Sequence, residues 1–134
     1  MCALALAAML QGFVPPMRSV DQGTQSAVSA RGEVTVRDAD GWATLWREHA
    51  PNRQRPAVDF SREMVVGVFL GTRATSGFSV EIVGAHDAGN ETTVQYRETT
   101  PARDAITAQV LTSPYHLVAT PKRPVTVRFE KVKN

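Results

Sequence analysis

The chain has 134 residues, of which 43% are hydrophobic and 21% are charged, as is ordinary for a single globular domain. A domain of this size buries roughly two-thirds of the surface that its unfolded chain exposes, so it needs neither a metal ion nor a disulfide to fold. The 15 basic and 13 acidic side chains give a net charge of +2 and are scattered along the chain. Nucleic-acid binding needs a clustered basic face with aromatic platforms, so this distribution argues against a nucleic-acid partner.

The first thirty residues are predicted to precede the folded unit. Residues 1–14 form an apolar stretch as long as a signal-peptide core and too short to span a bilayer, and they include the single cysteine, Cys2. No basic residues open the stretch, so two interpretations remain: a signal whose true start lies upstream, or a buried helix. Residues 15–30 are rich in Pro, Ser, Gln and Gly and are interpreted as a linker. The predicted folded domain is therefore 31–134.

One short helix is predicted near the start of this domain. Residues 33–37 alternate as a short strand does, and Asp38 or Asp40 can then cap a helix. An apolar stripe with helical spacing follows, made of Trp42, Leu45, Trp46 and His49. Pro51 disfavours helical geometry at the residue before it and ends the helix after about three turns.

The rest of the domain changes to the period of two that is typical of β-strands. Residues 64–70 are apolar on both faces, which predicts a central strand covered on both sides. Further strands are predicted around residues 78–82, 94–96, 106–110, 115–119 and 125–129. Six or seven short strands separated by frequent turns predict a mainly β fold, a β-sandwich or barrel-like antiparallel sheet with one short α-helix packed on it.

No motif in the sequence predicts catalysis, a metal or a cofactor. The histidines His49, His86 and His116 are not spaced from cysteines or carboxylates as metal ligands are, and His86 falls in a predicted hairpin turn. Neither a Gly-x-Ser-x-Gly elbow nor a phosphate-binding glycine loop occurs. A hydrolase or small-ligand site would need at least two of His86, His116, Asp59 and Ser61 to converge, which the sequence gives no reason to expect. We therefore expect a protein that is not an enzyme.

Two connections are unusual for plain scaffolding and are predicted to contact another protein. Residues 71–78 form a loop bounded by glycines, in which Gly77 indicates a positive φ or a close approach. Residues 112–116 combine a proline with an amphipathic aromatic at a predicted strand interruption. Loops carry binding functions disproportionately, and Tyr and Arg are favoured interface anchors. The predicted protein-binding residues are Arg73, Thr75, Ser76, Gly77, Phe78, Pro114, Tyr115 and His116. The structural alternative is that Gly77 shapes the connection, Phe78 is core and Tyr115 caps the sheet.

A series of short motifs occurs in order through about residues 57–121. Trp42 and Trp46, upstream of these motifs, agree with the same pattern. The motifs are Val58-Asp59-Phe60-Ser61, Met64-Val65-Val66, Phe69-Leu70-Gly71, Gly77-Phe78-Ser79-Val80-Glu81-Ile82 and Ser113-Pro114-Tyr115-His116. In this order they resemble the C-terminal domain family of PrcB, which more often has Thr-Gly-Gly-Tyr where this chain has Thr75-Ser76-Gly77-Phe78. The resemblance implies an exported bacterial protein, often a lipoprotein, whose namesake is associated with the stability of a surface protease complex.

The predicted function is a non-catalytic protein-binding module, an accessory or stabilising subunit of an exported protease or envelope complex. The loop at residues 72–78 is also similar to the Thr-Thr-Gly-Tyr/Phe loop of chagasin-type cysteine-protease inhibitors, which are β-sandwiches. Two alternatives therefore stay open: a protease inhibitor that blocks a cleft with this loop, and a small-ligand-binding domain. The partner is expected to be a protein, with a protease as one candidate, and the location periplasmic, cell-envelope or secreted. No stable membrane span is expected beyond a signal or anchor.

Overall fold

The computed structural model describes residues 14–133, so residues 1–13 of the predicted signal-like stretch at 1–14, including Cys2, lie outside the described residues. The described part contains seven strands and one α-helix. In chain order these are β1 (Arg18–Gly23), β2 (Gly32–Val36), α2 (Ala39–His49), β3 (Glu63–Phe69), β4 (Ser79–Ala88), β5 (Glu91–Thr99), β6 (Tyr115–Pro121) and β7 (Thr126–Val132). Within residues 14–133 no helix has the length and apolar character needed to cross a bilayer.

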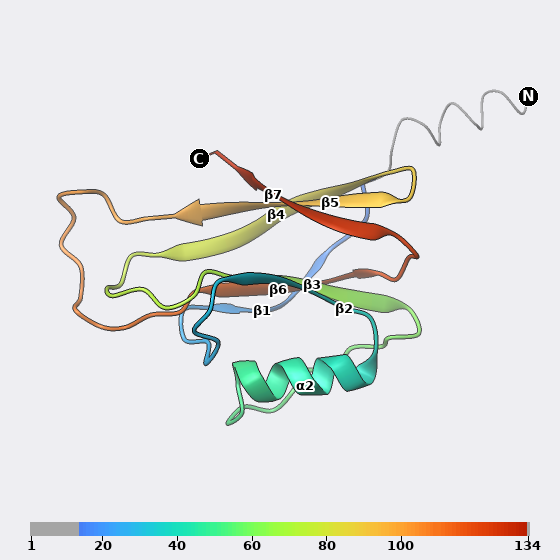
Figure 1. The fold of residues 1–134 in the computed structure, drawn as a ribbon, viewed down its shortest axis with the longest axis horizontal. Helices are drawn as coiled ribbons and strands as arrows, with labels where there is room; N and C mark the ends of the chain where they lie inside the picture. The colour runs from blue at the N-terminus through green and yellow to red at the C-terminus, as the bar shows by residue number, and fades with distance from the viewer. Residues whose placement is uncertain (1–13, 134) are drawn as a thin grey trace, which may run out of the picture.

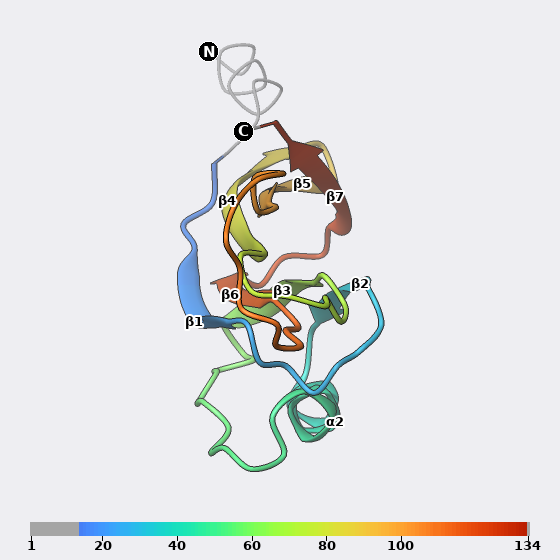
Figure 2. The ribbon, with the colours of Figure 1, turned by 90° about the vertical axis from the view of Figure 1, so that its left-hand side faces the viewer.

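The strands form two stacked sheets, and α2 covers the outer face of one of them (Figures 1 and 2). The four-stranded sheet has the order β1-β6-β3-β2 and is antiparallel throughout. The three-stranded sheet has the order β4-β5-β7, in which β4 pairs with β5 antiparallel. The predicted mainly β sandwich with one short helix is confirmed. One detail differs, because β7 runs parallel to β5: the chain crosses to the other sheet as β6 between them and returns in its original direction.

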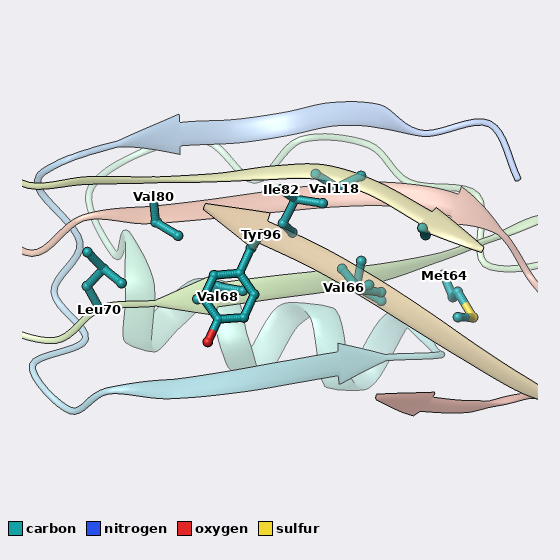
Figure 3. Close-up of a cluster of buried hydrophobic side chains, with 10 residues drawn as sticks. Met64, Val66, Val68, Leu70, Val80, Ile82, Tyr96 and Val118 are labelled. Carbon is teal, nitrogen blue, oxygen red and sulfur yellow. The ribbon is translucent and has the colours of Figure 1, made fainter. Parts of the chain in front are cut away.

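The central strand β3 sends its side chains alternately into two cores. One side faces the three-stranded sheet and buries Met64, Val66 and Val68 against the β4 and β5 side chains that Figure 3 shows. The other side buries Val65 and Phe69 against α2. Both faces of β3 are therefore covered, as the unbroken apolar run predicts.

The helix forms where its stripe and its cap predict it. The Asp38 carboxylate accepts a hydrogen bond of 2.7 Å from the Gly41 backbone N–H and satisfies one of the free donors of the first turn. The buried residues of α2 are Trp42, Leu45, Trp46 and His49. The helix ends at His49, two residues before Pro51, so its predicted position and stripe are confirmed.

Gly67 in β3 lies where no side chain fits. A Cβ atom there would lie 2.4 Å from a methyl carbon of Leu117, 3.1 Å from one of Val34 and 3.3 Å from the His116 carbonyl oxygen. We expect Gly67→Ala to lower the free energy of unfolding by about 1–3 kcal/mol, because the packed core must shift to admit the methyl group. Urea denaturation measures the change. Gly32→Ala is the control, since its Cβ would meet nothing within 4 Å; equal stability of the two variants would contradict the steric argument.

The segment at 15–30, interpreted from the sequence as a linker, instead contributes strand β1 to the four-stranded sheet. β1 pairs antiparallel with β6, with a register shift between Ser19 and Asp21. The strand escaped the sequence reasoning because its side chains are almost all polar, Val20 being the exception, so it has no apolar alternation. Main-chain pairing and polar side-chain contacts hold it in place instead.

Two other local predictions are wrong. Residues 100–114 contain isolated bridges at Thr112 and Ser113 rather than the strand predicted at 106–110, because that alternation has no face to pack against and Ile106 is fully exposed. His86 lies within β4 and is exposed, not in a turn. The β4–β5 hairpin extends beyond it and turns at Gly89, whose φ of 64° is the left-handed conformation that glycine adopts readily.

Candidate functional site

Two connections lie side by side at one end of the sandwich, at the left of Figure 1: residues 71–78 between β3 and β4, and residues 100–114 between β5 and β6. We call them the projecting loops. The Arg73 N–H donates to the Thr112 carbonyl at 2.7 Å, and the Thr112 N–H donates back to the Arg73 carbonyl at 2.9 Å. Further out, the Ser76 N–H donates to the Ala108 carbonyl at 3.1 Å, and the Ala108 N–H donates to the Ser76 hydroxyl at 2.9 Å. The two loops therefore hold each other in one shape.

Side chains of the first loop strengthen this arrangement. The Arg73 guanidinium carbon lies 5.6 Å from the centre of the Phe78 ring, which is a cation–π contact. The Arg73 Nε atom is buried and has no hydrogen-bond partner among the described residues. The Thr112 hydroxyl donates to the Thr75 carbonyl at 2.9 Å and so joins the two loops again. Arg73, Thr75 and Phe78 thus support the first loop from within. These contacts hold it more firmly than a loop of small residues alone would be held.

Gly77 has the backbone conformation that its position in the sequence predicts. Its φ is 97°, and a Cβ atom would lie 2.9 Å from Pro101 Cβ in the neighbouring loop. Both predicted reasons for a glycine, a positive φ and a close approach, are confirmed.

The outer surface of the second loop is unusually apolar. Of the five exposed large hydrophobic side chains among the described residues, three lie here: Ile106 at 102% exposure, Leu111 at 71% and Val110 at 49%. Sequence reasoning missed this surface because it assigned 106–110 to a packed strand. Clustered exposed apolar side chains on a soluble domain commonly mark an interaction site.

The second predicted connection, residues 112–116, does not form an exposed loop. Pro114 is fully buried, and Tyr115 and His116 are 4% and 5% exposed. Pro114 precedes β6 rather than interrupting a strand, and its carbonyl accepts a hydrogen bond from Leu70 N at 2.9 Å. The part of the predicted surface that solvent reaches is therefore in the projecting loops, while Tyr115 and His116 lie in the core beneath them.

A cluster of polar groups that sequence reasoning did not bring together surrounds His49. The His49 Nε2 atom lies 2.8 Å from an Asp21 carboxylate oxygen, and its Nδ1 atom lies 2.7 Å from the Ser26 hydroxyl. Arg53 binds both oxygens of Asp21, at 2.7 and 3.2 Å, and also donates to the Tyr115 hydroxyl at 3.2 Å. The cluster joins β1, the end of α2 and β6. The signal that could have found it is His49 itself, a polar residue on an otherwise apolar helical stripe.

Burial and charge set the protonation of this cluster. Burial lowers the pKa of His49 and outweighs the nearby Asp21 carboxylate, so the imidazole is neutral at pH 7. Burial alone would raise the pKa of Asp21, but hydrogen bonds from Arg53, His49 and Tyr115 lower it. His49 therefore donates a neutral N–H to a carboxylate whose charge is balanced by Arg53.

The contacts from Ser26 through His49 to Asp21 have the connectivity of a serine-hydrolase relay, with the two ring nitrogens exchanged. Acyl transfer also requires donors that point at the developing oxyanion. The nearest backbone donors are already used, because the N–H groups of Ser26, Ala27 and Val28 donate to the carbonyls of Ser113 and His49 and to the Ser26 hydroxyl. We interpret the cluster as a set of structural contacts that link β1, the end of α2 and β6.

The residues required by the hydrolase alternative do not form one site. Asp59 accepts hydrogen bonds from Ser61 within one exposed turn. His86 is exposed on β4, whereas His116 is buried, accepts the Ile82 N–H at 2.9 Å and contacts the Ser19 hydroxyl at 2.9 Å. In the part of the chain that the structure describes, no group of three or more His, Cys, Asp or Glu side chains is arranged to hold a metal ion.

The comparison with known proteins concerns the part of the chain from β3 to β6. Residues 64–121 match the family model described as PrcB C-terminal. The match runs from β3 through β6 and includes both projecting loops. Among curated proteins and solved structures, none matches this chain. The family resemblance predicted from the sequence is confirmed over residues 64–121, which are similar to the PrcB C-terminal family.

Proposed function

We propose that this chain is a non-catalytic protein-binding module that serves as an accessory or stabilising subunit of an exported protease or envelope complex. The observation that carries the proposal is the exposed apolar surface of the projecting loops, formed by Ile106, Val110 and Leu111. The family match supports it, since the family name points to a domain associated with a protease complex.

The energetics of the projecting loops favour association. Burying an isoleucine or leucine side chain against a partner contributes roughly 1.5–3 kcal/mol. Binding surfaces lose part of this gain when mobile loops must be ordered. Here the hydrogen bonds between Arg73 and Thr112 and between Ser76 and Ala108 already fix the loops, so less entropy is lost on binding.

The residues predicted to bind a protein have different parts in this proposal. Arg73, Thr75, Ser76 and Gly77 shape the projecting loops, and the half-buried Phe78 supports Arg73. Pro114, Tyr115 and His116 form the buried base below them. The partner contacts Ile106 and Leu111, which sequence reasoning had not selected.

Co-purification from the native envelope tests the proposal. The double substitution Ile106→Ser, Leu111→Ser should reduce recovery of the bound partner about tenfold or more, because two exposed apolar contacts are lost. Its stability should be unchanged, since neither side chain is buried. The matched control is Val83→Ser, which removes an exposed hydrophobic side chain from β4. Equal partner recovery by the double variant and the wild type would refute the assigned surface.

Two further experiments test whether the protein inhibits proteases and where in the cell it is located. If the protein slows a panel of cysteine and serine proteases at micromolar concentration, and the double variant does not, the projecting loops act as an inhibitor instead of a stabilising contact. Export is part of the proposal and comes from what the resemblance to the family implies. Fractionation of the native cells should recover the protein outside the cytoplasm, and cytoplasmic recovery would contradict this part.

A further inference from the structure

Strand β2 forms an edge of the four-stranded sheet that no other strand covers. It pairs with β3 through five consecutive residues without a register shift, and no strand lies on its other side. In an antiparallel edge strand, every second residue directs its N–H and C=O groups away from the sheet. Among the described residues, none of the backbone hydrogen bonds outside the helices and strands involves residues 33–36. β2 therefore presents free main-chain donors and acceptors.

A groove lies between this open edge and α2. Figure 2 shows these two elements next to each other. Its volume is about 520 Å³. Apolar contacts come from Val34, Val36 and Leu45, and polar ones from residues that include Thr44 and Glu48. An edge strand beside a helix, with an apolar groove between them, is the arrangement in which peptides add to a sheet as an extra strand.

Acidic residues that form no ion pair within the described part of the chain lie on the elements that border this groove, and two of them, Asp38 and Glu48, line it. Among the described residues, the carboxylates that take part in no ion pair are Glu33, Asp38, Asp40, Glu48 and Asp104. All except Asp104 lie on β2, on α2 or at its N-cap. Asp38 and Asp40 stabilise the start of the helix, but Glu33 and Glu48 have no such structural use. Arg37 also lines the groove, but its guanidinium donates to the carbonyls of Arg123 and Val125. The remaining negative charge, on a chain of net charge +2, favours a basic occupant.

We propose that β2 accepts an extended basic peptide segment as a fifth, antiparallel strand of the sheet. Apolar side chains of the peptide face α2 beside Val34 and Val36, and alternate basic ones lie on the opposite face with Glu33. Glu48 adds negative charge to the groove from α2. Five residues of strand span about 17 Å. The eleven residues of α2 span about 16 Å. A segment of five or six residues thus fills the groove. This site shares no residue with the projecting loops and goes beyond the proposed function.

The other sheet edges are less suited to an added strand. β1 and β4 each contain a register shift, and such irregularities interrupt pairing with a further strand. β7 has charged residues at 128, 130 and 131 that form ion pairs across its surface. Neither protection applies to β2, which is regular and has alternate valines facing α2.

Fluorescence polarisation with a labelled Val-Lys-Val-Lys-Val-Lys peptide tests the proposal on the whole chain. We expect saturable binding, with no binding of the matched Val-Glu peptide. N-methylation of alternate peptide residues removes half of its donors, so one of the two alternating methylation patterns should abolish binding and the other should not. Hydrogen exchange should show slower exchange within residues 33–36 when the peptide is bound.

Matched variants distinguish the groove from general charge attraction. Thr44→Tyr fills the groove from an exposed helical position and should weaken binding at least tenfold, whereas Thr126→Tyr on β7 should not. Glu48→Lys should weaken binding about fivefold. Asp104→Lys, which changes the net charge equally, should leave it unchanged.

Three results would overturn the proposal: equal binding of the Val-Glu peptide, affinities unaffected by Thr44→Tyr and Glu48→Lys, or a dimer in sedimentation that Thr44→Tyr dissociates. The last result would make a second copy of the chain the occupant. The double variant Ile106→Ser, Leu111→Ser should keep full peptide affinity, so failure at the projecting loops and failure at β2 are separable.

Discussion

Asp21→Ala is expected to lower the free energy of unfolding by about 3 kcal/mol, although the residue lies in a polar segment with no sequence signal for a strand. The substitution removes the acceptor of the buried His49 Nε2–H. Another polar atom near Nε2, Arg53 Nη2 at 3.5 Å, is itself a donor and cannot replace the carboxylate. It also removes both hydrogen bonds that Arg53 donates to the carboxylate. The side-chain contact between β1 and α2 is lost with them. Urea denaturation followed by circular dichroism measures the loss.

Two further variants define the cause. Asp59→Ala removes an exposed carboxylate that contacts Ser61 and Arg62 and should cost less than about 0.5 kcal/mol. Asp21→Asn keeps an oxygen acceptor of the same shape and should recover part of the stability. A loss below that of Asp59→Ala would show that β1 is held by its main-chain pairing alone.

Stability should also fall as the pH is lowered from 7 to 5. Burial lowers the pKa of His49 and of His116, in each case against the raising effect of nearby carboxylates, Asp21 for both and also Glu81 for His116. The unfolded chain binds protons at these histidines near pH 6.5, whereas the folded chain binds them only at lower pH. Each histidine therefore withdraws at most about 1.4 kcal/mol of stability per pH unit below that value.

The direction of this effect follows from which state takes up the proton. Protonation stabilises the unfolded chain, so the loss grows as the pH falls below about 6.5 and is absent above it. The lowered pKa of Asp21 acts only below about pH 4, outside this range. Urea titrations at a series of pH values should show a flatter profile for His116→Gln than for the wild type. A wild-type profile that is level from pH 7 to 5 would contradict the assignment.

The parts of the fold that sequence predicts are those with a strong apolar period. The helical stripe with Trp42 and Trp46 and the two-sided apolar run of β3 have unambiguous partners, because each must bury a large apolar face. β1 has no such face, and its place depends on pairing with β6, which is distant in the sequence. The parallel pairing of β7 with β5 likewise depends on the order of long-range contacts, which local patterns do not encode.

The candidate site was predicted only in part for a related reason. The glycine at 77 indicates an unusual backbone wherever it lies, so loop 71–78 could be identified from the sequence. Ile106 and Val110 alternate as strand residues do, and only the absence of a facing layer shows that they are exposed. Tyr115 has the composition of an interface anchor, but its ring packs 4.2 Å from that of His49. Residue type alone does not distinguish these environments.

The position of β6 has a consequence for the order of folding. It is an interior strand of the four-stranded sheet, between β1 and β3, yet begins only at Tyr115. A chain emerging from the ribosome or a translocon can form the β4–β5 hairpin early. It cannot join β1 to β3 until residues up to about 121 are available. Contacts over such separations make folding slow relative to helical proteins of the same size. Until then the edge of β3 that pairs with β6 stays open, so a chaperone that holds the nascent chain would have its greatest effect at this stage.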